Sequence, residues 1–244
     1  MQFRGAAIAL VFVLTITFGV KTAAQTIETN IITGPDGDTY ARIGADIGEL
    51  AGACGYELST QPSTGAFENL RAMRDRRATQ LGLVNADVLE FFAIEQVRDP
   101  ETARAARGIR VVMPLFLEEI HVIARREISD LVDLNGKAVA VGEAETGGHF
   151  TANLVLDLAK VSPAERVSIG GSDAIDLLQD GDVNAVILVG GAPIPFLEGT
   201  EIDPERFHLL AINDRSLTAA YAPATISAKT YPFLSQDTPT IGVR

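Results

Sequence analysis

Short apolar runs alternate along this chain with segments in which apolar residues recur every three or four positions. The recurrence predicts amphipathic helices at 40–54, 67–73 and 150–158. The runs are rich in Val, Ile and Leu and predict strands at 27–33, 56–61, 80–84, 109–116, 120–125, 138–141, 166–169, 185–189 and 207–210. Strands with near-continuous apolar sequence that alternate with helices indicate parallel sheets covered on both faces, so the expected fold class is α/β.

Two predicted strands break this alternation. The strand at 109–116 runs directly into the next apolar strand with no helix between them. Such a pair would carry the chain from one lobe to another, and 239–243 is the candidate for a return crossing. The expected organisation is therefore a signal peptide at 1–24, a first α/β lobe at 25–117, a second α/β lobe at 118–222 and a return segment to the first lobe at 223–244.

The first residues have the pattern of a secretory signal peptide. Arg4 precedes an apolar stretch at 6–20, and the small residues at 22–24 form a cleavage site before Gln25. An uncleaved anchor is the alternative, although the apolar stretch is short for a membrane span of about 20 residues. We therefore expect an exported, periplasmic protein.

Charge narrows the classes of partner. The 20 basic and 32 acidic residues give a formal charge of −12, and removal of Arg4 and Lys21 with the signal peptide lowers it to −14. Nucleic acids and anionic membranes attract clustered Lys and Arg, so neither is an expected partner. Cys54 is the only cysteine. Its place on the apolar stripe of a helix predicts a small buried residue rather than a reactive thiol.

Two strand–loop–helix units carry glycines, at 31–40 and 139–148. Such a turn leaves the first N–H groups of the helix unpaired and directs the positive end of the helix dipole toward the loop. Glycine lets a ligand approach this backbone closely. Two units about a hundred residues apart therefore suggest two lobes that present helix ends to one shared ligand.

Several further loops follow the carboxyl ends of predicted strands, where ligands of parallel sheets bind. For any one of these residues, a capping or turn role is an equally good interpretation. A helix N-terminus contributes only about 0.3–1 kcal/mol toward an anion, and a micromolar ligand needs about 8 kcal/mol, so loops of both lobes would have to act together. The candidate ligand-binding residues are Gly37, Asp38, Thr39, Tyr40, Ser63, Thr64, Asn85, Thr146, Gly147, Gly148, His149 and Gly191.

Catalysis, cofactors and metals have little support in the sequence. His121 and His208 lie inside predicted strands, where a structural role is expected, and no nucleophile elbow, zinc-binding His-Glu-x-x-His or Walker loop occurs. An exported hydrolase that pairs a Ser or Thr with His149 remains the enzymatic alternative.

The ordered motifs resemble the TAXI group of TRAP transporter solute-binding proteins. The resemblance implies a type II periplasmic binding fold in which two α/β lobes close on a small solute such as glutamate or 2-oxoglutarate, for delivery to a TRAP membrane permease. The positions that match the family's site residues are Gly37, Thr39, Tyr40, Ser63, Thr64, Asn85, Thr146 and Gly148, so the resemblance implies that these residues bind the solute. The matching stretches are 34–44, 63–70, 83–88, 133–137, 141–152, 223–226, 230–232 and 240–243.

The chain departs from the family pattern at several of these positions. Asp38 and Glu145 stand where the family has glycine, Ala66 where it has serine, and His149 where it has arginine. These changes make a neutral, zwitterionic or cationic ligand compatible with the loops, and they leave open an exported sensory or scaffold module with an altered pocket. Family members also continue after the return strand into further helices that complete the first lobe. We therefore expect a type II fold in which these C-terminal helices are missing.

Overall fold

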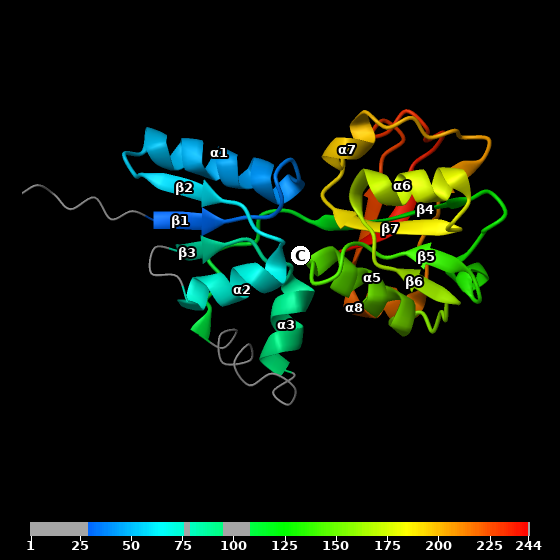
Figure 1. The fold of residues 1–244 in the computed structure, drawn as a ribbon, viewed down its shortest axis with the longest axis horizontal. Coiled ribbons are helices and arrows are strands. Elements are labelled where there is room, and N and C mark those ends of the chain that lie inside the picture. The colour runs from blue at the N-terminus through cyan, green and yellow to red at the C-terminus, as the bar shows by residue number, and fades with distance from the viewer. Residues whose placement is uncertain (1–28, 76–78, 95–107, 244) are drawn as a thin grey trace, which may run out of the picture.

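The computed structural model describes residues 29–75, 79–94 and 108–243, which form two α/β lobes side by side (Figure 1). Each lobe is built on its own β-sheet with helices packed against it. The α/β class and the two-lobed organisation expected from the sequence are confirmed.

The first lobe has a three-stranded parallel sheet with the order β2-β1-β3. The register pairs Ile32 with both Gln61 and Gly82, so the three carboxyl ends meet at one edge of the sheet. α1 packs beside β2, and α2 packs beside β3 (Figure 1). The elements are β1 (Thr29–Ile32), α1 (Thr39–Ala53), β2 (Leu58–Gln61), α2 (Ala66–Asp75), β3 (Thr79–Gly82) and α3 (Ala86–Ile94).

The second lobe has a seven-stranded mixed sheet with the order β6-β5-β7-β4-β10-β9, and β8 pairs with β4. β5 is parallel to β6 and β7, whereas β4 is antiparallel to β7, β8 and β10. Its strands are β4 (Glu118–Arg125), β5 (Ala138–Ala140), β6 (Glu165–Val167), β7 (Ala185–Gly190), β8 (Phe207–Leu209), β9 (Ala222–Ile226) and β10 (Thr238–Val243). Its helices are η1 (Leu131–Leu134), α5 (Gly147–Leu158), α6 (Gly171–Asp180), α7 (Pro195–Glu198) and α8 (Arg215–Ala220).

Both faces of the second sheet are buried. Along β4, Ile120 and Val122 belong to the core that includes α5 and α8, while Ile123 belongs to the core that includes α6 and α7. In Figure 1, α6 and α7 lie on one side of the sheet, and α5 and α8 lie on the other. This double burial explains why the central strands β5 and β7 are almost continuously apolar.

The crossing between the lobes differs from the expected strand. Residues 109–117 carry no regular secondary structure, and Val111, Val112 and Met113 are exposed. The apolar run was predicted as a strand because its composition favours one, but a strand needs a paired neighbour, and the described sheet of the first lobe ends at β3.

The segment 223–244, expected to return to the first lobe, lies in the second sheet through β9 and β10 as far as Val243. β10 runs antiparallel to β4, and Val243 pairs with Glu118 at the crossing. The signal peptide at 1–24 lies outside the described residues and stays a prediction.

The prediction of a buried Cys54 was wrong, because the residue is exposed at the C-cap of α1. The small first sheet covers little of this helix: Gly44 is its only fully buried residue, and Leu50 is 69% exposed. No helix in the described part of the chain is long and apolar enough to span a membrane.

Candidate functional site between the lobes

A cavity of about 420 Å³ lies between the two lobes. Both glycine-bearing loops line it, one from the first lobe and one from the second. The predicted site residues on its wall are Gly37, Asp38, Thr39, Tyr40, Thr64, Asn85, Thr146, Gly147 and Gly148.

The wall from the first lobe is the N-terminus of α1. Gly37 adopts a φ of 85°, a left-handed conformation that glycine adopts without strain. Asp38 is the N-cap, and its Oδ1 accepts a 2.7 Å hydrogen bond from the N–H of Ala41. Burial raises the pKa of the Asp38 carboxyl, against the lowering effect of its backbone hydrogen bonds. One oxygen of the Asp38 carboxyl group therefore caps α1 by accepting a hydrogen bond from its first turn.

The wall from the second lobe has the N-termini of α5 and α6. Thr146 caps α5 by accepting a 3.1 Å hydrogen bond from the N–H of His149. The N-cap of α6 is Gly170, which has no side chain to cap the helix. Gly170, Gly171 and Ser172 all line the cavity. The first amide groups of α6 therefore have no capping side chain and lie at the cavity wall.

Three predicted site residues lie off the cavity. The Ser63 hydroxyl accepts a 3.0 Å hydrogen bond from the N–H of Gly65 and holds the turn before α2. His149 Nδ1 lies 3.1 Å from the carbonyl oxygen of Gly142, across the β5–α5 loop. Gly191 faces Phe116, since a Cβ there would come within 3.0 Å of that ring. Gly190, one residue earlier, lines the cavity instead.

Glu118 is the main residue of the cavity that sequence reasoning missed. It is the first residue of β4 and only 6% exposed, yet it lines the cavity. Asn85 Nδ2 donates a hydrogen bond to its Oε2, and the Tyr40 hydroxyl donates a second hydrogen bond to the same carboxyl group. Burial, reinforced by the charge of Asp87, raises the pKa of Glu118 to about 8. The sequence did contain a signal for Glu118: an acidic residue at the start of an apolar strand, directly after the crossing segment.

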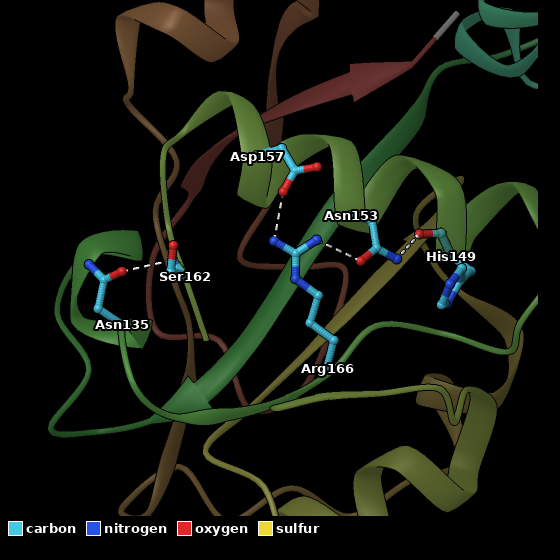
Figure 2. A network of polar contacts seen from close by, with 6 residues as sticks. All are labelled: Asn135, His149, Asn153, Asp157, Ser162 and Arg166. Atoms are coloured by element: carbon cyan, nitrogen blue, oxygen red, sulfur yellow. Dashed lines mark hydrogen bonds and ion pairs between the residues drawn. The ribbon is translucent and has the colours of Figure 1, made fainter. Parts of the chain in front are cut away.

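A side-chain network connects α5 to β6 (Figure 2). Arg166 on β6 donates to Asn153 Oδ1 at 2.9 Å and to Asp157 Oδ1 at 2.7 Å. Asn153 Nδ2 in turn donates to the backbone oxygen of His149 at 2.7 Å. The first turn of α5, which lines the cavity, is thereby fixed to the sheet.

A second chain of hydrogen bonds holds the loop before α7. The N–H of Ile194 donates to the Tyr231 hydroxyl at 2.7 Å, and Tyr231 lies 2.9 Å from His121 Nε2. His121 Nδ1 lies 3.0 Å from the carbonyl oxygen of Glu119. Because a carbonyl only accepts, Nδ1 carries the proton and Nε2 accepts from Tyr231. Burial lowers the pKa of His121 to about 4. The expected structural role of this histidine is confirmed.

The two lobes also contact each other beside the cavity. Asp87 of α3 accepts hydrogen bonds from the hydroxyl groups of Thr151 and Tyr221 in the second lobe. Phe150 of α5 packs against the rings of Phe67 and Phe91 in the first lobe. The structure therefore shows the lobes in a closed arrangement.

A second cavity, of about 460 Å³, lies within the first lobe. Tyr40 and Glu118 separate it from the cavity between the lobes, because both residues line both spaces. Its remaining wall is mainly apolar, with Met73, Leu83 and Met113 among its residues. The cavity between the lobes, where the polar loops meet, is the candidate solute site.

Two α/β lobes that enclose a cavity lined by helix N-termini define the architecture of the periplasmic solute-binding proteins. The chain belongs to the NMT1-like family, whose profile matches residues 31–244. A comparison with curated proteins finds no significant match.

Solved structures with a similar fold include solute-binding proteins and a regulatory domain. The regulatory domain of CcmR from Synechocystis PCC6803, in complex with 2-PG, shares 14% identity over 88% of this chain and 86% of its own, with a TM-score of 0.48. The amino acid ABC transporter substrate-binding protein AbpA from Streptococcus pneumoniae, bound to L-arginine, shares 18% identity over 89% of this chain and 81% of its own, also with a TM-score of 0.48. The GluR0 ligand-binding core with L-glutamate shares 17% identity over 68% and 71%, with a TM-score of 0.46. At these scores, the ligands of those proteins do not indicate the solute of this one.

Proposed function

We propose that this protein is an extracytoplasmic receptor that captures a small polar solute between its lobes. The observation that carries the proposal is the meeting of the α1 and α5 N-termini, one from each lobe, on one cavity of about 420 Å³. This volume suits a solute of the size of an amino acid or a small organic acid. The amide groups of several helix ends provide hydrogen-bond donors for its polar groups.

The partner that we propose is a TRAP-type membrane permease, and the compartment is the periplasm. The order of the TAXI-like motifs and the predicted signal peptide support this assignment. The resemblance points to glutamate or 2-oxoglutarate as candidate solutes.

We propose a binding role without catalysis. The hydrolase alternative needs the His149 imidazole as a base beside a Ser or Thr in the cavity. Its Nδ1 instead lies at the Gly142 carbonyl oxygen, and the residue does not line the cavity.

The test is ligand titration of the purified protein with amino acids and organic acids, followed by thermal shift and calorimetry. We expect at least one solute to raise the melting temperature, since a ligand that binds only the native state stabilises it. No stabilisation by any small polar solute would contradict the proposal.

Two variants on α6 locate the binding site. Ser172→Phe places a ring on the cavity wall and should abolish binding. Asp176→Phe adds the same ring one turn further along, at an exposed position that does not line the cavity, and should leave binding intact. Equal loss in both variants would place the solute elsewhere.

A sensory or scaffold module of the same fold is the second candidate. The departure at Ala66 supports it, because this buried residue removes a hydroxyl group from the cavity wall. A permease gene beside this one would favour transport, and a sensor kinase gene would favour signalling.

A further inference from the structure

The cavity between the lobes has an uneven charge. Four of the residues that line it are acidic: Asp36, Asp38, Glu118 and Glu143. Among the described residues that line it, none is Arg, Lys or His. A solute whose only charged groups are carboxylates would therefore meet several carboxyl groups and no basic side chain.

The helix ends do not reverse this balance. A helix N-terminus carries about half a positive charge, less than one carboxylate. The carboxylate of Asp38 already accepts from the first turn of α1, and the Thr146 hydroxyl already accepts from the first turn of α5. The charged side chains of the wall therefore favour a positive group, and the uncapped amide groups of α6 can receive a negative group of the same solute.

Glu118 is placed to receive that positive group. Its carboxyl is at the wall between the lobes, and neighbours from the first lobe fix its position. Tyr40 and Asn85 donate hydrogen bonds to it and carry no positive charge. The carboxyl group is thus oriented, and among the residues that the structure describes it has no cationic partner.

We propose that the solute bound in this cavity carries a positively charged nitrogen, which the Glu118 carboxylate recognises. This inference rests on the proposed receptor function and narrows its solute class to amines, guanidines and amino acids. It excludes 2-oxoglutarate, which has no such nitrogen.

Binding of a cation should change the protonation of Glu118. The titratable groups around Glu118 are Tyr40 and Asp38 from α1 and Asp87 from α3. The charges of Asp38 and Asp87 disfavour a negative charge on Glu118. Tyr40 is neutral near pH 7, because its pKa is raised well above the usual value. β10 faces it through Val243, which does not titrate. Glu118 with a pKa of about 8 is therefore mainly protonated at pH 7 in the empty cavity. A bound cation favours the carboxylate, so the Glu118 proton leaves to solvent as the cation binds.

The experiment uses three matched sets of compounds on the full-length protein: the common amino acids, the amines formed by their decarboxylation, and the corresponding 2-oxoacids. We expect thermal-shift hits among the amino acids and amines and none among the oxoacids. An oxoacid that binds as tightly as its amino acid would overturn this inference and leave the receptor function standing. No hit in any set would contradict the receptor function and this inference with it.

The role of Glu118 is tested with the best hit by calorimetry at pH 7 in buffers of different ionisation enthalpy. The protein should release about one proton per bound ligand. Glu118→Gln should bind about 30-fold or more weakly and release none. Glu127→Gln, the same change in the exposed turn that follows β4, should behave like the unaltered protein.

The unaltered protein gives an independent readout in case Glu118→Gln folds poorly. Its affinity for the hit should rise between pH 6 and pH 8, as Glu118 becomes easier to ionise. An affinity that does not change over this range, with no proton released, would contradict the role of Glu118.

Discussion

The Thr151 hydroxyl of the second lobe donates a 2.7 Å hydrogen bond to the Asp87 carboxylate of the first lobe. Thr151 is fully buried, and Asp87 also accepts a 3.1 Å hydrogen bond from Tyr221. Burial raises the pKa of Asp87, against the lowering effect of these hydrogen bonds. The contact joins α3 to α5 beside the cavity, so it stabilises the closed arrangement of the lobes.

Replacement of Thr151 by valine should weaken this closed arrangement. The change keeps the shape of the side chain and removes the hydroxyl donor, and a hydrogen bond to a charged group contributes about 1.5–3 kcal/mol. We expect a loss of about that size in the free energy of unfolding and a larger radius of gyration in small-angle X-ray scattering.

Thr218→Val is the matched control. Its hydroxyl donates to the backbone oxygen of Arg215 within α8, and the residue is exposed. It should change stability little and leave the radius of gyration unchanged. The same expansion in both variants would show that the hydroxyl of Thr151 has no special role between the lobes.

Two neighbouring glycines at the start of α5 should respond very differently to alanine. A Cβ at Gly147 would lie 1.9 Å from Asn85 Oδ1 and 2.8 Å from its Cγ. Asn85 is held by Glu118, so either this hydrogen bond breaks or the lobes separate. Gly147→Ala should therefore open the structure in small-angle scattering and reduce solute binding.

Gly148→Ala serves as the comparison. Its Cβ would meet only Val189, at an ordinary 3.7 Å. Replacing a helical glycine by alanine favours the helix by about 0.5–1 kcal/mol, so this variant should be slightly more stable than the unaltered protein. A closed Gly147→Ala variant would show that the contact with Asn85 adjusts without moving the lobes.

The apolar pattern was sufficient to predict the fold class and most strands of both sheets. It is clearest in β7 of the second sheet, which is buried and apolar along its length. It failed at 109–116, where the composition of a strand occurs without a pairing partner. Helix α6 has strong amphipathic character but was not predicted, and its uncapped N-terminus on the cavity wall was missed with it.

At the candidate site, the residues of the glycine-bearing loops could be proposed from the sequence because their backbone chemistry is visible there, and most of them line the cavity. Glu118 was not found, because its importance depends on burial and on neighbours from distant segments. His149 was predicted from its place in the loop, but the fold brings its Nδ1 to the Gly142 carbonyl oxygen, and the residue is not among those that line the cavity. The sequence identifies which residues lie in a loop but not where their side chains point.

His121 should weaken the protein in acid. Its pKa is about 4 in the folded state, below the ordinary value of 6.5, because burial disfavours the charged ring. The unfolded chain therefore binds a proton between pH 6.5 and pH 4 that the native protein does not bind, and stability falls as pH falls through this window, by up to about 3 kcal/mol.

His121→Gln, which stays neutral, should flatten this acid limb in urea unfolding measured at pH 6.5 and pH 4.5. His208→Gln is the control, since His208 is less buried and its Nε2 donates to the Ile128 carbonyl oxygen. The comparison uses the slope with pH rather than the absolute stability, so a general loss of stability in His121→Gln does not affect it. An unchanged slope would show that His121 is charged in the native state.

Glu118 should have the opposite effect from His121, because it should lower the stability of the protein as pH rises. Its pKa rises from 4.5 to about 8 on folding, chiefly through burial. Above pH 4.5 the unfolded chain releases this proton while the native protein keeps it, so stability falls as pH rises to about 8 and then levels off. The loss amounts to roughly 3–5 kcal/mol over the window.

Glu118→Gln should retain its stability at pH 8, whereas Glu127→Gln should lose it as the unaltered protein does. If Glu118→Gln lost stability in parallel with the other two proteins, Glu118 would be ionised in the empty cavity and a bound cation would release no proton.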